Sequence, residues 1–409
     1  MRRVLRKQRE CRLDILLTVL LLCGIGIVMI YSASSYQCSR SAKYDFDGSY
    51  FMKRQMIYIF AGTVTCILLQ FAHYRLLKHC AQIIYIICIL LIFLLLTPAG
   101  VSINGATRWL GIGGVQFQVA EVVKIGVIIF LAYMVQRYYK HLRNWRVVLY
   151  MWMAGGGAAV LLWRISNDLS SAIVILGITF GITFVFTGTT KLHVVVAAGG
   201  ALLVSAYVLY IYKHLPSPED INNVSFRVGR IAAWLKPELY ELGTGYQSIQ
   251  ALYAIGRGGI WGCGLGNSIQ KLNALPEAQN DMIFAVLCEE LGMFGAVLLI
   301  GLYLYLFWNF IHVAKKSIDI FGSVLVVGCL IHLSCQTLIN IAVNLSVIPN
   351  TGIGLPFVSY GGTAVFGQLI EIAMIFSVDR VGSGYKNIDL TKVSNYRRTY
   401  KGKKRVVDN

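Results

Sequence analysis

The chain has 409 residues, of which 56% are hydrophobic and only 14% are charged. Soluble domains carry about 25% charged residues, so this composition argues against a soluble globular enzyme and indicates that lipid is the solvent. The net charge of +18 does not indicate a nucleic-acid partner, because most lysines and arginines fall in the tails and in short loops between apolar runs. The ten cysteines include no closely spaced ligand pair, and no metal site is predicted.

Ten apolar runs approach or reach the length of about 20 residues that crosses a bilayer. They lie at about 13–33, 55–72, 79–97, 118–136, 147–164, 169–187, 192–212, 283–308, 319–343 and 363–379. The predicted fold class is therefore an all-α polytopic membrane protein with about ten transmembrane helices. Its parts are a basic amino-terminal segment at 1–12, a membrane domain at 13–380 and a basic tail at 381–409.

The distribution of basic residues predicts the orientation. An even number of spans places both termini on one side of the membrane. The tails and the loops of that side hold 24 of the 37 lysines and arginines. Basic residues concentrate in cytoplasmic segments, so we expect both termini in the cytoplasm.

Two segments on the other, external side contain many glycines. Segment 98–117, PAGVSINGATRWLGIGGVQF, carries Arg108 as its single charge, and segment 344–362, NLSVIPNTGIGLPFVSYGG, carries none. Irregular backbone at membrane depth is stable only where protein or a wet cavity covers it. The second segment is therefore either a re-entrant stretch that lines a site or an ordinary external loop.

The one large external loop, residues 214–282, separates the seventh and eighth spans. Its apolar residues recur at helical spacing, which predicts short amphipathic helices in the membrane interface. The loop ends in LPEAQND, with Glu277 and Asp281 four residues apart where the chain re-enters the membrane. A partly desolvated carboxylate has a raised pKa and suits a general base. The alternative is a solvated acid or a helix cap.

Further charged residues are candidates for binding an anionic head group. On the external side these are Arg108, Arg227, Arg230 and Lys271, although each could instead pair with an acid of the same loop. Glu121 and Lys124 lie one turn apart in the fourth span, where ionisable pairs serve either function or helix packing. Asp168 opens the sixth span and could simply cap it.

Five ordered motifs resemble the SEDS family of shape, elongation, division and sporulation proteins over about residues 13–380. They are GATRWL at 105–110, the segment 117–124, GTGYQSIQALYAIGRGGIWGCGLG at 243–266, LPEAQNDMIFAVLCEELG at 275–292 and PNTGIGLPFVSYGG at 349–362. The early pieces IVMIYSASS and YFMKRQ favour the division and sporulation branch, which includes FtsW. The chain departs from the family at Gln118–Glu121, where a Gln-Pro-Ser-Glu pattern is common.

The resemblance implies a peptidoglycan glycosyltransferase that polymerises lipid II at the outer face of the bacterial cytoplasmic membrane. It implies Asp281 as the catalytic base, and it places Arg108, Glu121 and Lys124 on family motif positions. Our substrate-binding candidates are Arg108, Glu121, Lys124, Asp168, Arg227, Arg230, Lys271, Glu277 and Ser359.

The implied reaction also suggests a cofactor and a partner. Either basic side chains or a divalent cation, Mg²⁺ or Mn²⁺, would offset the charge of the leaving pyrophosphate. The expected partner is a class B penicillin-binding protein, alongside membrane lipids. Two other functions stay open: a flippase for lipid II and a non-catalytic scaffold for a transpeptidase.

Overall fold

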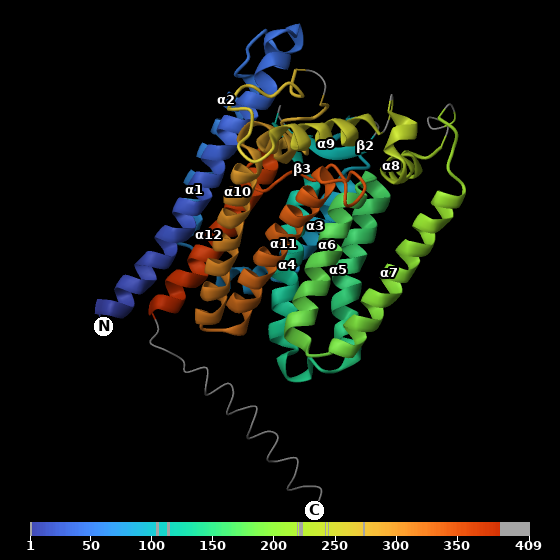
Figure 1. The fold of residues 1–409 in the computed structure, drawn as a ribbon. Coiled ribbons are helices and arrows are strands. Elements are labelled where there is room, and N and C mark those ends of the chain that lie inside the picture. The colour runs from blue at the N-terminus through green and yellow to red at the C-terminus, as the bar shows by residue number, and fades with distance from the viewer. Residues whose placement is uncertain are drawn as a thin grey trace, which may run out of the picture.

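The computed structural model describes residues 2–103, 106–112, 115–218, 220, 224–241, 243, 245–272 and 275–384. Within these residues, ten helices of 19 residues or more run along the length of the molecule (Figure 1). They are α1 (Arg2–Ser39), α2 (Tyr50–Leu69), α3 (Arg75–Leu94), α4 (Val119–Arg137), α5 (Trp145–Ser166), α6 (Leu169–Thr187), α7 (Thr190–Lys213), α10 (Ile283–Lys316), α11 (Ile320–Asn344) and α12 (Gly362–Gly384).

Each long helix overlaps one predicted span, which confirms a mostly helical, multi-span membrane protein. Eight of the helices are long and apolar enough to cross a membrane, and α2 and α12, which pack against each other, lie where the second and tenth spans were predicted. A count of ten spans therefore stays a prediction. The start of α1 and the end of α12 lie at the same end of the bundle (Figure 1), as an even number of crossings requires.

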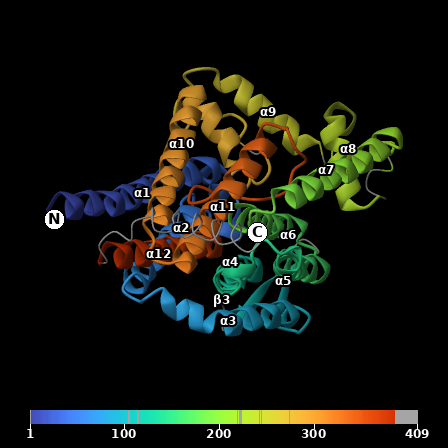
Figure 2. The same cartoon turned by 90° about the horizontal axis from the view of Figure 1, so that it is seen from below.

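Burial divides the bundle into a packed centre and an open edge. The apolar windows of α4 and α10 are 72% and 67% buried, whereas that of α7 is 6% buried. The open helix α7 leans away from its neighbours in Figure 1 and lies at the periphery in Figure 2. Its Ile211 packs with Ala232, Ala233 and Tyr240 in a small separate core. Lipid must cover most of α7, because its exposed side chains are apolar.

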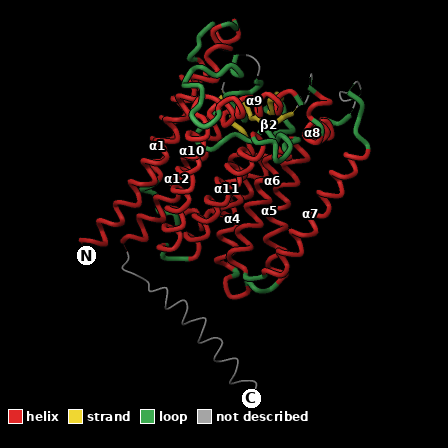
Figure 3. Tube along the Cα trace, viewed as in Figure 1, coloured by secondary structure: helices red, strands yellow, loops and turns green. Residues whose placement is uncertain are grey.

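Loops and short elements gather at the opposite end of the bundle from the start of α1 (Figure 3). The large loop contains α8 (Phe226–Leu235), α9 (Tyr246–Gly258) and, between them, one described turn of 3₁₀ helix, η3 (Pro237–Tyr240). These two short helices confirm the amphipathic segments predicted for residues 214–282. The other 3₁₀ turns are η1 (Ala42–Tyr44) and η2 (Tyr139–His141).

A small sheet, which the all-α prediction did not include, occupies the glycine-rich segment between α3 and α4. Strands β1 (Gly100–Ile103), β2 (Ala106–Ile112) and β3 (Val115–Gln118) pair antiparallel in that order. Leu110 of β2 lies opposite Gly100 on one side and Phe117 on the other, and it is fully buried. Strand β2 carries Arg108 at a bulge, between the pairs Val101–Trp109 and Ser102–Thr107.

Helix α10 is interrupted at Gly292, whose φ of 65° is outside the helical region. The loop fills this break: the amides of Cys263 and Gly264 donate to the carbonyls of Glu289 and Glu290, at 3.0 Å each. In the other direction, Met293 and Phe294 donate to Gly259 and Ile260, at 2.9 and 3.2 Å. The four bonds satisfy backbone groups that the broken helix cannot pair by itself.

The segment between α11 and α12 folds back into the protein, as the re-entrant interpretation predicts. Leu355, Phe357 and Val358 are each no more than 2% exposed. The backbone at 357–358 lies so close to Gly26 of α1 that a Cβ there would meet it at 2.7 Å. On its other side, the amide of Phe357 donates to Gln368 Oε1 of α12, at 2.9 Å. Neighbouring helices therefore enclose this irregular backbone.

Candidate functional site

Asp281 lies two residues before α10, and α11 holds its backbone. The Nδ2 atoms of Asn340 and Asn344 both donate to the carbonyl of Asp281, at 2.8 and 2.9 Å. Asn340 also donates to Ile353 of the re-entrant segment, and Asn344 Oδ1 accepts the amide of Ala285 in the first turn of α10. Both asparagines are fully buried. The position of Asp281 is therefore set by the helix that packs beside α10.

The Asp281 side chain is 6% exposed, and its carboxylate faces amide groups of other segments. Gln247 Nε2 of α9 lies 3.4 Å from Oδ1 and 3.5 Å from Oδ2. The pKa of Asp281 is raised to about 6, chiefly by burial and also by the nearby charge of Glu277, against the lowering effects of Arg230 and the Asn350 amide. A carboxyl with this pKa is mostly ionised at neutral pH and remains a competent base.

Glu277 and Asp281 are four residues apart in the sequence, but the segment that holds them is a turn that precedes α10, not a helix. The backbone of Glu277 has a φ of 52°, and its exposed carboxylate accepts a hydrogen bond from Asn280 Nδ2. Glu277 therefore acts on Asp281 through its charge, and among the described contacts no hydrogen bond joins the two.

Arg108 and Arg230 approach the same site from the sheet and from α8. Burial lowers the pKa of Arg230, and two neighbouring charges act on it, with Asp281 raising its pKa and Arg108 lowering it. Arg230 Nη1 donates to the carbonyl of Asn350 at 3.0 Å, and the buried Nε of Arg108 has no partner. Within the described residues, neither arginine forms an ion pair. Two adjacent guanidinium groups without a carboxylate partner form a natural anion site.

Arg227, the other candidate of α8, lies toward the end of α5. Its guanidinium carbon is 5.4 Å from the ring centroid of Trp163, which is the geometry of a cation–π contact.

Glu121 and Lys124 form a buried ion pair within the helical bundle. Lys124 Nζ lies 2.7 Å from Glu121 Oε1, and both side chains are less than 10% exposed. A second pair, His332 Nδ1 and Glu371 Oε1 at 2.6 Å, joins α11 to α12. The described contacts include no hydrogen bond from these residues to Asp281. The four side chains lie within the helical bundle, and a contact of Glu121 or Lys124 with substrate stays a prediction.

Two other substrate-binding candidates, Asp168 and Ser359, have hydrogen-bond partners within the protein. Asp168 caps α6: its Oδ1 accepts the amide of Ser171 at 3.0 Å, and its Oδ2 accepts the hydroxyl of Ser171 at 2.8 Å. Ser359 Oγ accepts the amide of Leu355 at 2.7 Å and stabilises the re-entrant turn. Both side chains therefore have a structural role, and their contact with substrate stays a prediction.

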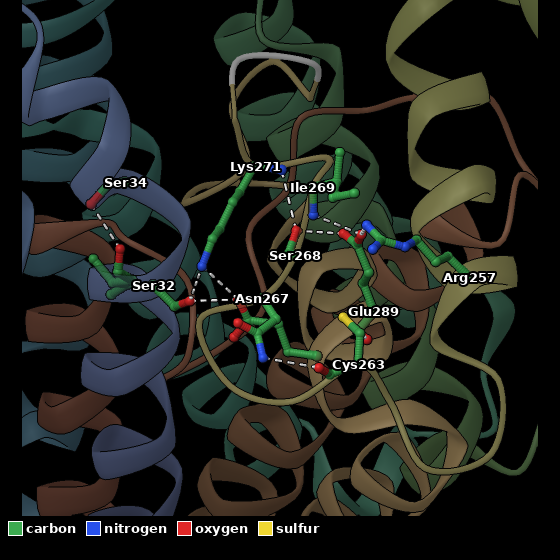
Figure 4. Close-up of polar contacts among 11 residues, drawn as sticks. Ser32, Ser34, Arg257, Cys263, Asn267, Ser268, Ile269, Lys271 and Glu289 are labelled. Atoms are coloured by element: carbon green, nitrogen blue, oxygen red, sulfur yellow. Dashed lines mark hydrogen bonds and ion pairs between the residues drawn. The ribbon is translucent and has the colours of Figure 1, made fainter.

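Lys271 reaches into a buried network near the kink of α10 (Figure 4). Its Nζ lies 2.9 Å from both Glu290 Oε1 and Ser32 Oγ of α1. Beside it, Arg257 and Ser268 bind the carboxylate of Glu289, with Arg257 Nη1 at 3.0 Å (Figure 4). Lys271 therefore holds the loop against α1 and α10, and its contact with substrate stays a prediction.

The sequence prediction did not single out the amide residues around Asp281. Gln247 and Asn350 lie in the motifs at 243–266 and 349–362, but only the fold places them at the carboxylate. Within the described residues, no group of three His, Cys, Asp or Glu side chains could hold a metal ion.

The chain is similar to known proteins over nearly its whole length. The cell cycle protein family model FTSW_RODA_SPOVE matches residues 13–383. "Stage V sporulation protein E" of Bacillus subtilis (strain 168) is 35% identical over 371 residues, which cover 90% of this chain and 97% of that protein. "Probable peptidoglycan glycosyltransferase FtsW" of Trichlorobacter lovleyi is 32% identical over 383 residues, 93% of this chain and 96% of that protein.

A solved structure has the same fold. A chain of "Structural coordination of polymerization and crosslinking by a peptidoglycan synthase complex" superposes with a TM-score of 0.71 at 25% sequence identity. The match covers 91% of this chain and 98% of that one.

Proposed function

Since the chain belongs to the cell cycle protein family of FtsW, RodA and SpoVE, we propose that it is a peptidoglycan glycosyltransferase that polymerises lipid II. Membership of the SEDS family, predicted from five motifs, is thereby confirmed. The relatives named above carry the names SpoVE and FtsW, which belong to the branch that the early motifs favour.

The observation that supports this function best is one ionisable carboxylate near two arginines that form no ion pair within the described residues. Asp281 is buried, has a pKa of about 6, and lies close enough to Arg230 for its charge to act on it. Glycosyl transfer from a lipid pyrophosphate needs both of these parts. It needs a base for the acceptor hydroxyl, and it needs cations for the departing pyrophosphate.

In the proposed reaction, Asp281 takes the proton of the acceptor sugar's 4-hydroxyl as that oxygen attacks the anomeric carbon of the donor. The bond from that carbon to the pyrophosphate oxygen breaks, and undecaprenyl pyrophosphate leaves with the bonding electrons. Arg108 and Arg230 stabilise its negative charge. A single displacement from the face opposite the leaving group inverts the anomeric centre.

A divalent cation is a further proposal. Mg²⁺ is commonly held by one or two carboxylates together with substrate phosphates. Glu277, which is exposed next to Asp281, could supply such a carboxylate. Polymerisation that stops in EDTA and resumes with Mg²⁺ or Mn²⁺ would support this role, and full activity in EDTA would reject it.

The partner and the orientation are proposals as well. The related solved chain belongs to a peptidoglycan synthase complex that couples polymerisation and crosslinking. We therefore expect this chain to bind a class B penicillin-binding protein, which copurification would test. We expect both termini in the cytoplasm, which reporter fusions at residues 2 and 384 would test.

Polymerisation of purified lipid II by the purified protein tests the function directly. Wild type should form glycan chains, and Asp281→Asn should form none. Asp47→Asn provides a matched control, because Asp47 is an aspartate of another loop that pairs with Lys53 and lies outside the site. A near-wild-type rate for Asp281→Asn would reject Asp281 as the base. Translocation of lipid II by a wild-type protein that does not polymerise it would favour the flippase alternative.

A further inference from the structure

We propose that Gln247 and Asn350 are positioning residues that hold the Asp281 carboxylate in the orientation that accepts the proton. This inference rests on the proposed function and adds two residues to it. Neither side chain needs to touch the reacting atoms, because both act through Asp281.

The first step is the direction of the hydrogen bonds. The backbone amide of Gly352 donates to Asn350 Oδ1 at 2.8 Å, which turns Asn350 Nδ2 outward. That Nδ2 donates to Gln247 Oε1 at 2.7 Å, which in turn directs Gln247 Nε2 toward Asp281. A backbone N–H can only donate, so it fixes which way both amides face.

The second step is the place of Gln247 Nε2 at the carboxylate. Its distances to the two oxygens, 3.4 and 3.5 Å, are nearly equal, so the nitrogen lies across the mouth of the carboxylate. It also lies 3.3 Å from the carbonyl of Pro276. The amide therefore limits rotation of the carboxylate, while its long contacts leave lone pairs for an incoming hydroxyl.

The third step is that each group comes from a different part of the fold. Gln247 lies on α9, Asn350 lies in the re-entrant segment, and Asp281 lies before α10. Asn340 and Asn344 of α11 hold the Asp281 backbone, so its remaining freedom is rotation of the side chain. The two amides restrict that rotation.

Arg230 links this network to the anion site. Its Nη1 donates to the carbonyl of Asn350, and the Asn350 side chain leads to Gln247. The arginine that we expect to bind the pyrophosphate therefore also fixes the residue that orients the base. Donor binding and base orientation share one short chain of contacts.

The experiment compares polymerisation of purified lipid II by full-length variants at several pH values. Gln247→Met keeps the length of the side chain and removes the donor. It should lower kcat about ten- to a hundredfold with KM within twofold, since a misplaced base slows the chemical step and not substrate binding. Loss of a donor to the carboxylate should also move the acid limb of the pH profile up by about half to one unit.

Two further variants sharpen the measurement. Gln247→Glu has the same shape but places a second negative charge at Asp281, so its acid limb should move up further than that of Gln247→Met. Asn350→Ala should act in the same direction with a smaller effect, because Gln247 keeps its contact with Pro276. Gln250→Met on the same helix is the matched control, since the described contacts of Asp281 do not include Gln250.

The outcomes separate this inference from the proposed function. If Asp281→Asn is inactive but Gln247→Met has the kcat and pH profile of wild type, the positioning role is wrong and the base stands. If Gln247→Met lowers kcat without moving the acid limb, Gln247 only packs, and the inference is again overturned. If Asp281→Asn is active, the proposed base itself fails. Elution of each variant as a single peak in detergent shows that the protein is folded.

Discussion

Removing the charge of Lys271 should destabilise the protein without weakening substrate binding. The Lys271 and Glu290 side chains are 6% and 0% exposed, and their charged atoms lie 2.9 Å apart. In Lys271→Met, Glu290 would stay buried with the hydroxyl of Ser32, at 2.6 Å, as its remaining described donor. Its other oxygen, Oε2, already has no partner. Breaking one side of a buried pair costs about 3–5 kcal/mol, which we expect here.

A double variant isolates the pair from the rest of the fold. Glu290→Gln removes the negative charge and keeps the shape of the side chain. Lys271→Met combined with Glu290→Gln should cost only about 1–2 kcal/mol, because no buried charge is left uncompensated. The pair of Lys53 and Asp47 provides the control. Its side chains are 60% and 35% exposed, so Lys53→Met should cost no more than about 1 kcal/mol.

The assay is the midpoint of thermal unfolding in detergent, measured at one heating rate because such proteins unfold irreversibly. KM for lipid II is measured on the same samples below the midpoint. The reasoning is refuted if Lys271→Met melts like wild type, or if the double variant is as unstable as the single one. A raised KM at an unchanged midpoint would restore the substrate-binding role that the sequence suggested.

Four further predictions concern the site and its support. Polymerisation should fall as the pH drops through about 6, because Asp281, with its pKa raised to about 6, then takes up a proton. The same raised pKa affects stability. Asp281 contributes fully to the stability of the folded protein at pH values below the pKa that it has in the unfolded chain, and this contribution is lost as the pH rises through about 6. At pH values above 6, Asp281→Asn should therefore increase the free energy of unfolding by up to about 3 kcal/mol. Arg230→Lys should raise KM for lipid II about tenfold in a Michaelis titration, because an ammonium cannot bind a phosphate with two parallel hydrogen bonds; an unchanged KM would remove Arg230 from the anion site. Gly292→Ala should abolish folded protein in a size-exclusion profile, since its φ is 65° and a Cβ would lie 2.4 Å from the amide nitrogen of Gly262. In contrast, Gly256→Ala, where a Cβ meets nothing within 4 Å, should be neutral or stabilising by about 1 kcal/mol.

Hydropathy predicted the long helices because each span is a local property of about 20 consecutive residues. The three-stranded sheet escaped prediction for the opposite reason. Its short strands contain many glycines, and their pairing, such as Gly100 with Leu110, is visible only in three dimensions.

The site was predicted in part. Asp281 could be found because it ends a polar loop at the start of an apolar run, and the buried pair of Glu121 and Lys124 could be found from its helical spacing. The buried network of Lys271 could not be predicted because it joins Glu290 of α10 to Ser32 of α1, which is 239 residues away from Lys271 in the chain. Asn350 and Gln247 were missed because 103 residues separate them and amides carry no charge that would draw attention.

The break in α10 has a consequence for how such proteins can be recombined. The backbone of 259–264 completes the backbone of 289–294, so neither stretch has a full set of hydrogen bonds without the other. A chimera that takes the loop from one relative and α10 from another would pair two backbone stretches from different proteins, and their hydrogen bonds would depend on a matching geometry. A chimera that takes residues 257–294 from one relative should still be expressed. A chimera whose boundary lies at residue 275, so that the two stretches come from different relatives, should not be expressed. The loop and the first turns of α10 should therefore be exchanged together when chimeras of these proteins are made.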